Sequence, residues 1–337
     1  MLKPLWSTPQ KPNVFCRRAA IFAVFFVAVG TSFLSYSCPS DAAFDGETVI
    51  SGALIPATRP PQLDPTLLKV PAKQTQSKFF DALSSKVTPI SEELVKKYKL
   101  DTTFYKKHLD YRGFSIFSSA KVSDAGLYEA RYLMHCLLHE REDIVKALIK
   151  SGTRFMVMAP TEMTTDVPEQ RHMKNDPKTN WDQRARGLGG KLTSCGEENL
   201  LNLKGDRYNS ENILIHEFNH AVHNQALRSV DPTFDGRLSK IFNSAKSKGL
   251  WKGTYLMENK GEYWAEACQA YFDTMRAQFA PKKSKVDTHN QMKEYDPDLY
   301  KLVEEVYKGS KYRYVRYDVR QKSGGPIHPD PTQIGNK

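Results

Sequence analysis

One segment constrains this chain more than any other. Residues 209–224 contain the sequence His-Glu-Phe-Asn-His at 216–220, an H-E-x-x-H pattern. On a helix, residues four apart lie one turn above each other, so the two imidazoles would point at one place. Neutral histidine nitrogens bind zinc at about 2.0–2.1 Å, and a glutamate beside the first histidine can take a proton from water on the metal. We therefore predict that His216 and His220 bind zinc and that Glu217 is the general base of a hydrolase.

The residues around this pattern favour a helix. Asn209 and Ser210 are residue types that commonly cap a helix start. His223 lies on the same face as the two histidines but about 4.5 Å farther along the axis, which favours a surface position or a contact to a ligand over direct metal binding. Apolar residues recur at helical spacing on one side of the pair: Leu214, Phe218, Ala221, Val222 and Leu227.

The start of the chain has the pattern of a targeting segment. Residues 1–18 carry four Lys or Arg and no acid, and residues 19–36 are mostly apolar. This charge pattern predicts a cytoplasmic N-terminus and transfer of the rest of the chain across a membrane. Two interpretations stay open: an uncleaved anchor, which gives a single-pass type II membrane protein, and a cleaved signal peptide, which gives a secreted one. Both predict an extracytoplasmic domain.

The rest of the chain divides into a linker, a folded domain and a tail. Residues 37–75 hold six prolines with little periodicity, which predicts an extended linker or stalk. Residues 323–337 are rich in glycine and proline and predict a flexible tail. We expect one folded domain between them, over residues 76–322.

The domain's periodicities predict an α+β fold with a small mixed sheet, in which strands alternate with helices. We expect residues 160–190 to form a long loop and one wall of a cleft. We expect residues 192–194 to form an edge strand beside the H-E-x-x-H helix. The other predicted elements are a helix from 91, a strand at 114–117, a helix running to about 139, a helix at 142–150 and a strand at 154–159.

Cysteine content and charge narrow the environment and the partners. Three cysteines fall in the domain, and an oxidising compartment allows one disulfide among Cys136, Cys195 and Cys268, with the pairing left open. The net charge of +11 permits contact with anionic partners without requiring it. Alternating Tyr and Arg at 312–320 superficially suggests stacking on nucleic acid. The same pattern describes a half-exposed strand, which we favour, and we predict no nucleic-acid partner.

A catalytic zinc site needs a third protein ligand. The metzincin pattern would supply it six residues after the second histidine, but an alanine stands there. Downstream, Glu262 and Glu266 stand four apart on a predicted helix, where like charges are unfavourable unless a cation lies nearby. We expect Glu262 to bind zinc and Glu266 to accept the other N–H of His216. The alternative is a capping box from Asn259, in which Glu262 only caps its own helix.

Together the two segments resemble the lethal-factor-like group of gluzincin metallopeptidases, which includes the catalytic domain of anthrax lethal factor. The family pattern, H-E-F-G-H-A-V and then Y-x6-E-F-F-A-E-A, is similar to residues 216–222 and 255–267, with Asn219 in place of a glycine. Asn219 should not touch the metal but could narrow the cleft. The resemblance covers about residues 209–272 and implies a zincin-like fold. It also implies these roles: His216, His220 and Glu262 as zinc ligands, Glu217 as general base, and Tyr255 as the hydroxyl that stabilises the oxyanion.

The sequence therefore predicts a zinc-dependent endopeptidase with one Zn2+ per chain. It would hydrolyse a peptide or protein substrate with a zinc-activated water and Glu217 as general base. Its N-terminal apolar segment would also hold it to the membrane if uncleaved. Two other classes stay open: a non-catalytic binding module on a metallopeptidase fold, and a zinc hydrolase acting on a non-peptide amide. The presence of every expected catalytic side chain favours the endopeptidase.

Overall fold

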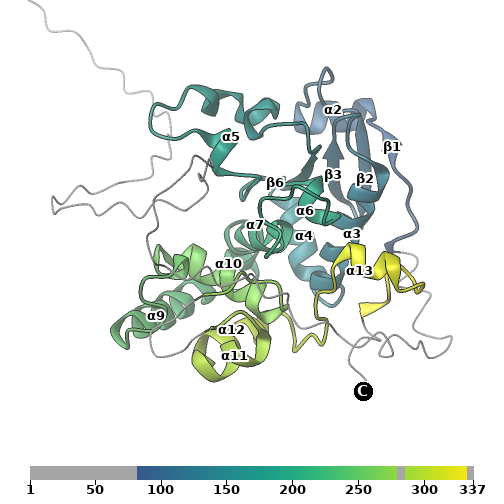
Figure 1. Ribbon diagram of the computed structural model, residues 1–337. Coiled ribbons are helices and arrows are strands. Elements are labelled where there is room, and N and C mark those ends of the chain that lie inside the picture. The colour runs from purple at the N-terminus through teal and green to yellow at the C-terminus, as the bar shows by residue number, and fades with distance from the viewer. Residues whose placement is uncertain (1–81, 279–284, 332–337) are drawn as a thin grey trace, which may run out of the picture. The chain divides into compact units, whose positions relative to one another are not determined.

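The structure is a computed structural model that describes residues 82–278 and 285–331 (Figure 1). By their contacts the residues divide into two units, Met1–Ile55 and Pro56–Lys337, and all described residues belong to the second. The predicted targeting segment and linker lie outside the described residues. None of the helices at 82–278 and 285–331 has both the length and the apolar character needed to cross a bilayer.

A six-stranded mixed sheet forms the centre of the described domain (Figure 1). Its strands are β1 (Thr88–Pro89), β2 (Lys107–Tyr111), β3 (Phe114–Ser118), β4 (Arg154–Met158), β5 (Gly187–Leu188) and β6 (Leu192–Gly196). They lie in the order β1-β2-β3-β4-β6-β5; β3, β4 and β6 run parallel, and the other pairs are antiparallel. The predicted α+β class is confirmed. The predicted strand at 192–194 is not an edge strand, because β5 pairs with its outer side.

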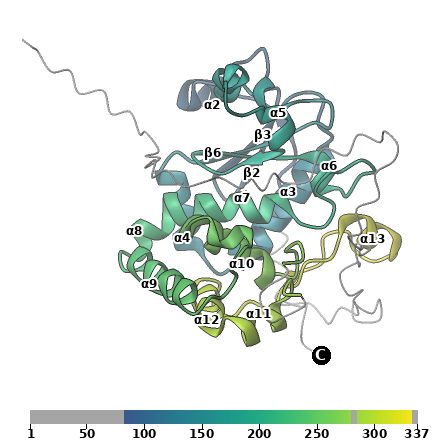
Figure 2. The ribbon, with the colours of Figure 1, turned by 60° about the vertical axis from the view of Figure 1, so that its left-hand side comes forward.

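Helices cover both faces of this sheet (Figure 2). On one face lie α2 (Glu92–Tyr98), the 3-10 segments η2 (Thr164–Asp166) and η3 (Pro168–Asn175), and α5 (Trp181–Arg184). The prediction of a long loop over 160–190 is therefore wrong, since η2, η3, α5 and β5 all fall within it. On the other face lie α3 (Asp124–Leu138), α4 (Glu142–Lys150), α7 (Ile213–Ala221) and α10 (Lys260–Tyr271).

Further helical elements complete the domain. The π-helical segment η4 (Val222–Leu227) extends α7, and the 3-10 segment η5 (Tyr255–Met257) precedes α10. The C-terminal half ends in a helical layer in which α10 contacts α7, α9 and α12. The remaining helices of the described domain are α6 (Glu197–Leu200), α8 (Arg228–Val230), α9 (Phe234–Ser247), α11 (His289–Tyr295), α12 (Pro297–Val306) and α13 (Tyr317–Lys322).

The alternation of side chains along β3 and β4 supplies two hydrophobic cores. Ile116 and Val157 face the main core, which α3, α4, α7 and α10 share. The adjacent residues Phe117 and Met158 face a smaller core that includes Tyr98 of α2. Neighbouring strand residues point to opposite faces, and all residues of β3 and all but the first of β4 are buried. The sheet is therefore buried on both sides and gives α7 a rigid support.

The helix that carries the H-E-x-x-H pattern begins later than predicted. Asn209 and Ser210 do not cap it; Asn212 does, with its side-chain oxygen accepting from the backbone N–H of Ile215 at 3.0 Å. A second prediction, a strand of alternating Tyr and Arg, is also wrong. Residues 311–316 form no strand, and Tyr317 begins the short helix α13.

The cysteines of the domain are free thiols. Cys136 lies on α3, Cys195 on β6 and Cys268 on α10, and all three are buried. The disulfide that the sequence allowed is therefore absent from this part of the chain. Their burial in the apolar core accounts for their presence without any redox role.

The packed part of the chain continues past the predicted domain end at 322. Buried Glu129 of α3 pairs with Arg320, and His328 Nε2 lies 3.2 Å from its other carboxylate oxygen. The His328 ring also packs against Tyr132, with 4.8 Å between ring centroids. At least this part of the expected tail is thus attached to α3.

The histidine His135 of α3 should make the fold sensitive to acid. Burial lowers its pKa to about 3, and the charges of His139 and Arg112 act in the same direction. An unfolded histidine titrates near 6.5. Between these values the unfolded state binds more protons, so the stability is present at neutral pH and is lost as the pH falls. We expect this group to lower the unfolding free energy by up to about 1.4 kcal/mol per pH unit.

Urea titrations of the metal-free protein between pH 7 and 4 would measure this slope. His135→Gln should flatten it, whereas the exposed control His172→Gln should leave it unchanged. An equal slope in wild type and His135→Gln would contradict the assignment.

Candidate functional site

Helix α7 places the two pattern histidines side by side. Its apolar residues, including Leu214 and Phe218, are buried in the main core, and α7 packs on β6. His216 and His220 project from another side of the helix, with ring centroids 4.8 Å apart. Their Nε2 atoms are 3.1 Å apart. The four-residue spacing thus brings two imidazole nitrogens to one point, as the pattern predicted.

Glu262 of α10 faces these nitrogens. Its Oε2 atom lies 3.1 Å from Nε2 of His216 and 3.3 Å from Nε2 of His220. Donor atoms of the three side chains lie within 4.8 Å of one another, and no other described His, Cys, Asp or Glu cluster has the makings of a metal site. Two imidazole nitrogens and one carboxylate oxygen form a donor set typical of catalytic zinc. The residues present therefore fit a zinc ion.

The capping alternative for Glu262 disagrees with the structure. The side-chain oxygen of Asn259 accepts from the backbone N–H groups of Gly261 at 2.8 Å and Glu262 at 3.1 Å. The Glu262 carboxylate does not return to the backbone of Asn259, so α10 has no capping box. Asn259 alone caps the helix, and the carboxylate of Glu262 turns to the histidines.

The charges at this point favour a cation. Burial lowers the pKa of His216, but its hydrogen bond to Glu262 and the charges of Glu217 and Glu266 outweigh this and raise the pKa to about 10. Burial raises the pKa of Glu262, but the hydrogen bonds from His216 and His220 outweigh it and hold the pKa well below its usual range. The negative charges of several carboxylates therefore lie close together here, and a bound metal ion would offset them.

Glu217 has the environment of a group that exchanges protons. Burial raises its pKa, and the charges of His216 and His220 offset this only in part. The backbone at Gly189 lies close by: a Cβ added there would be 3.2 Å from Oε2 of Glu217 and 2.5 Å from Cβ of His220. The end of segment 160–190 therefore lies against the histidine-bearing helix.

Tyr255 of η5 lies beside the same group. Its ring centroid is 6.4 Å from that of His216, and the Arg276 guanidinium lies over its ring, 5.1 Å from the centroid. Burial raises the pKa of Tyr255, and the negative charge of Glu262 adds to the effect. The hydroxyl therefore remains protonated at neutral pH and is available as a hydrogen-bond donor.

The predicted partner of His216 is wrong. Its Nδ1 atom lies 3.0 Å from Oε1 of Gln269 but 3.9 Å from Oε1 of Glu266. The carboxylate of Glu266 instead accepts from Arg276 at 3.3 Å and from Gln278 at 3.2 Å. Gln269 follows Glu262 by seven residues, which places both on one face of α10. This spacing was a usable signal, but the sequence interpretation considered only carboxylates for the role.

Two other residues of the H-E-x-x-H helix and its extension have hydrogen-bond partners outside the group formed by His216, His220 and Glu262. His223 is buried, and its Nε2 atom lies 2.6 Å from Asp235, so the alternative of a surface position is wrong. Asn219 is also buried; it accepts from the hydroxyl of Tyr307 and donates to the carbonyl of Ile215 at 2.6 Å. The suggestion that Asn219 narrows the cleft is therefore wrong, because its side chain lies in the core.

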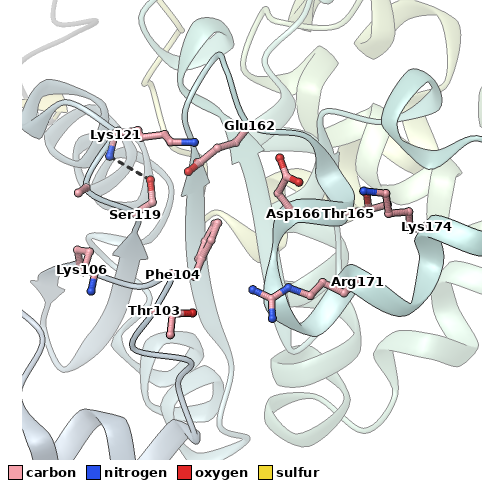
Figure 3. Close-up of a pocket in the computed structure, with 11 residues that line it drawn as sticks. Thr103, Phe104, Lys106, Ser119, Lys121, Glu162, Thr165, Asp166, Arg171 and Lys174 are labelled. Carbon is pink, nitrogen blue, oxygen red and sulfur yellow. Dashed lines mark hydrogen bonds between the residues drawn. The ribbon is translucent and has the colours of Figure 1, made fainter.

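A cavity of about 590 Å³ is lined by residues that follow the carboxyl ends of β3 and β4, among others (Figure 3). None of the residues that line it belongs to the His216, His220 and Glu262 group. Its acids already serve the fold, since Glu162 accepts from the backbone of Ala159 and Asp166 from that of Met163. Four basic side chains line it: Lys106, Lys121, Arg171 and Lys174. The cavity holds no group suited to the predicted chemistry.

Substitution of Gly189 should disturb the site. A Cβ at this position meets Cβ of His220 at 2.5 Å, so Gly189→Ala must move the chain away from α7. Overpacking of this kind costs about 1–3 kcal/mol. We expect a fall of several degrees in the thermal midpoint. Gly236→Ala on α9 is the control; its Cβ would have no neighbour within 4 Å, so it should be neutral or stabilising. Equal midpoints for both variants would contradict the close approach at Gly189.

Comparisons with known proteins identify a family and related solved structures. A family model described as "Anthrax toxin lethal factor, N- and C-terminal domain" matches residues 137–306, about half of the chain. Among solved structures, the Pro-Pro endopeptidase PPEP-2 from Paenibacillus alvei is similar, with 20% identity and a TM-score of 0.40. That match covers 57% of this chain and 96% of the other. No curated protein matches the chain.

Proposed function

Because the chain belongs to the anthrax toxin lethal factor family and has its metallopeptidase fold, we propose that it is a zinc-dependent endopeptidase of the gluzincin type. The observation that carries this proposal is the convergence of His216, His220 and Glu262, with Glu217 and Tyr255 beside them. His216, His220 and Glu262 would hold one zinc ion per chain. The substrate would be a peptide or a protein.

The chain's own residues supply most of the proposed mechanism. When bound, zinc polarises a carbonyl oxygen and makes water a better nucleophile at neutral pH. The Glu217 carboxylate accepts a proton from the attacking water and delivers it to the leaving amine, which its raised pKa favours. The Tyr255 hydroxyl donates a hydrogen bond to the substrate oxygen that gains negative charge.

We also propose an extracytoplasmic location, with the chain either anchored as a type II membrane protein or secreted. The support is the sequence of residues 1–36, a basic segment followed by an apolar one. An oxidising compartment does not require a disulfide, so the free buried thiols of the domain are compatible with this location.

Zinc content is the direct test of the proposed site. Purified wild-type protein should hold about one zinc per chain, measured by mass spectrometry of metals. Glu262→Gln should lose most of it, because a carboxylate ligand is replaced by a neutral amide. Glu258→Gln, at an exposed position four residues earlier and before the start of α10, is the matched control and should retain zinc. Wild type that stays zinc-free after incubation with the metal would leave a non-catalytic binding module.

Peptide cleavage tests the two catalytic side chains. Glu217→Gln and Tyr255→Phe should both retain zinc, because neither residue belongs to the ligand group. We expect Glu217→Gln to lower kcat by at least about 100-fold, and Tyr255→Phe by about 10²–10³-fold, since each removes a group needed in the transition state. Cleavage of a peptide library would give the rates. Zinc binding without cleavage of any library peptide would instead support a hydrolase of non-peptide amides.

A further inference from the structure

We propose that Gln269 is a positioning residue: it fixes which ring nitrogen of His216 carries a proton and which one faces the metal. This inference rests on the proposed zinc site. Gln269 lies on α10, is fully buried, and contacts His216 from the side opposite Glu262. Its Oε1 atom lies 3.0 Å from Nδ1 of His216.

The other contacts of Gln269 determine how its amide is oriented. Its Nε2 group donates to the backbone carbonyl of Asn212 at 3.0 Å and to Oε2 of Glu211 at 3.3 Å. Both partners are acceptors, so they require the NH2 end of the amide. The oxygen end therefore faces His216. If the amide were reversed, its oxygen would lie against the carbonyl oxygen of Asn212 and a carboxylate oxygen of Glu211, and neither of these can donate a hydrogen bond.

This orientation decides the tautomer of His216. An amide oxygen accepts but cannot donate, so Nδ1 of His216 must carry a hydrogen to bond with it. In a neutral imidazole the lone pair then lies on Nε2, the atom that faces Glu262 and His220 at 3.1 Å each. A hydrogen bond from the far nitrogen of a metal-binding histidine holds the ring in place and fixes this choice.

A carboxylate at position 269 would not serve equally well. It has no donor for the carbonyl of Asn212, and it would stand beside the carboxylate of Glu211. Arg276 lies 3.5 Å from Glu211 and 3.3 Å from Glu266, so its charge is already shared between two acids. A glutamine orients the histidine here without adding a third negative charge.

Zinc affinity and NMR of the zinc-loaded protein test the inference. Gln269→Met keeps an unbranched side chain of similar size but removes the hydrogen bonds. We expect it to weaken zinc binding by about 10–100-fold in a chelator competition. In ¹⁵N-edited spectra, the Nδ1–H proton of His216 should exchange slowly in wild type and quickly in Gln269→Met.

One control variant and a second test variant separate this role from a general effect on folding. Gln278→Met also removes a buried glutamine, one that donates to Glu266 and does not contact His216. It should bind zinc within about threefold of wild type and keep the slow Nδ1–H signal. Gln269→Glu should weaken zinc binding as Gln269→Met does, which keeps the inference testable if one variant fails to fold.

Several outcomes would overturn the inference. Wild-type affinity and a slow Nδ1–H signal in Gln269→Met would show that Gln269 positions nothing. A loss of zinc in Glu266→Gln but not in Gln269→Met would assign the role to Glu266. A zinc-loaded wild type without a slowly exchanging Nδ1–H on His216 would exclude the hydrogen bond itself. Wild type that binds no zinc would instead remove the proposed function, and the inference with it.

Discussion

The packing of α10 against α7 is the contact on which the candidate site depends. The two histidines come from one helix, but their third partner is 42 residues after the second of them, and only this helix pair brings it near. The buried indole of Trp264 joins the helices where α7 ends, donating from Nε1 to the carbonyl of Asn219 at 3.0 Å. Elsewhere along α10, Glu262 contacts Nε2 of His216 and Gln269 contacts Nδ1, so the two residues hold the ring from both sides.

The same packing gathers several carboxylates around the two histidines. Glu211, Glu217, Glu262 and Glu266 surround one pair of imidazoles, with Arg276 shared between two of the acids. Burial raises the pKa of Glu266 to about 7; the charges of His216 and Arg276 oppose this shift, and those of Glu211 and Glu262 add to it. A divalent cation would offset this repulsion, so metal binding should also contribute to the stability of the fold. Function and stability are thus linked at the α7–α10 contact.

The sequence predicted those parts of the site that depend on local spacing. H-E-x-x-H predicted the placement of the two histidines because residues four apart lie on one face of a helix, and strands were predicted at 114–117 and 154–159. The seven-residue spacing places Gln269 on the same face of α10 as Glu262, but it does not show that a glutamine orients His216. That role depends on the tertiary contacts of Gln269 with Asn212 and Glu211. β5 was missed because a two-residue strand has no periodicity. It is defined by pairing with β6 and by glycines that permit close approach to α7.

Asn219 shows how a departure from a family pattern can be absorbed by packing. The pattern has glycine here, and the larger side chain suggested a narrower cleft without contact to the metal. The residue instead points to the opposite side of α7, where its amide oxygen accepts from Tyr307 at the end of α12 and its NH2 group returns to the carbonyl of Ile215. A buried amide is tolerated only when its polar atoms are paired, and these two bonds pair both ends. Asn219 therefore joins α7 to the C-terminal helical layer and leaves the arrangement of His216, His220 and Glu262 unaltered.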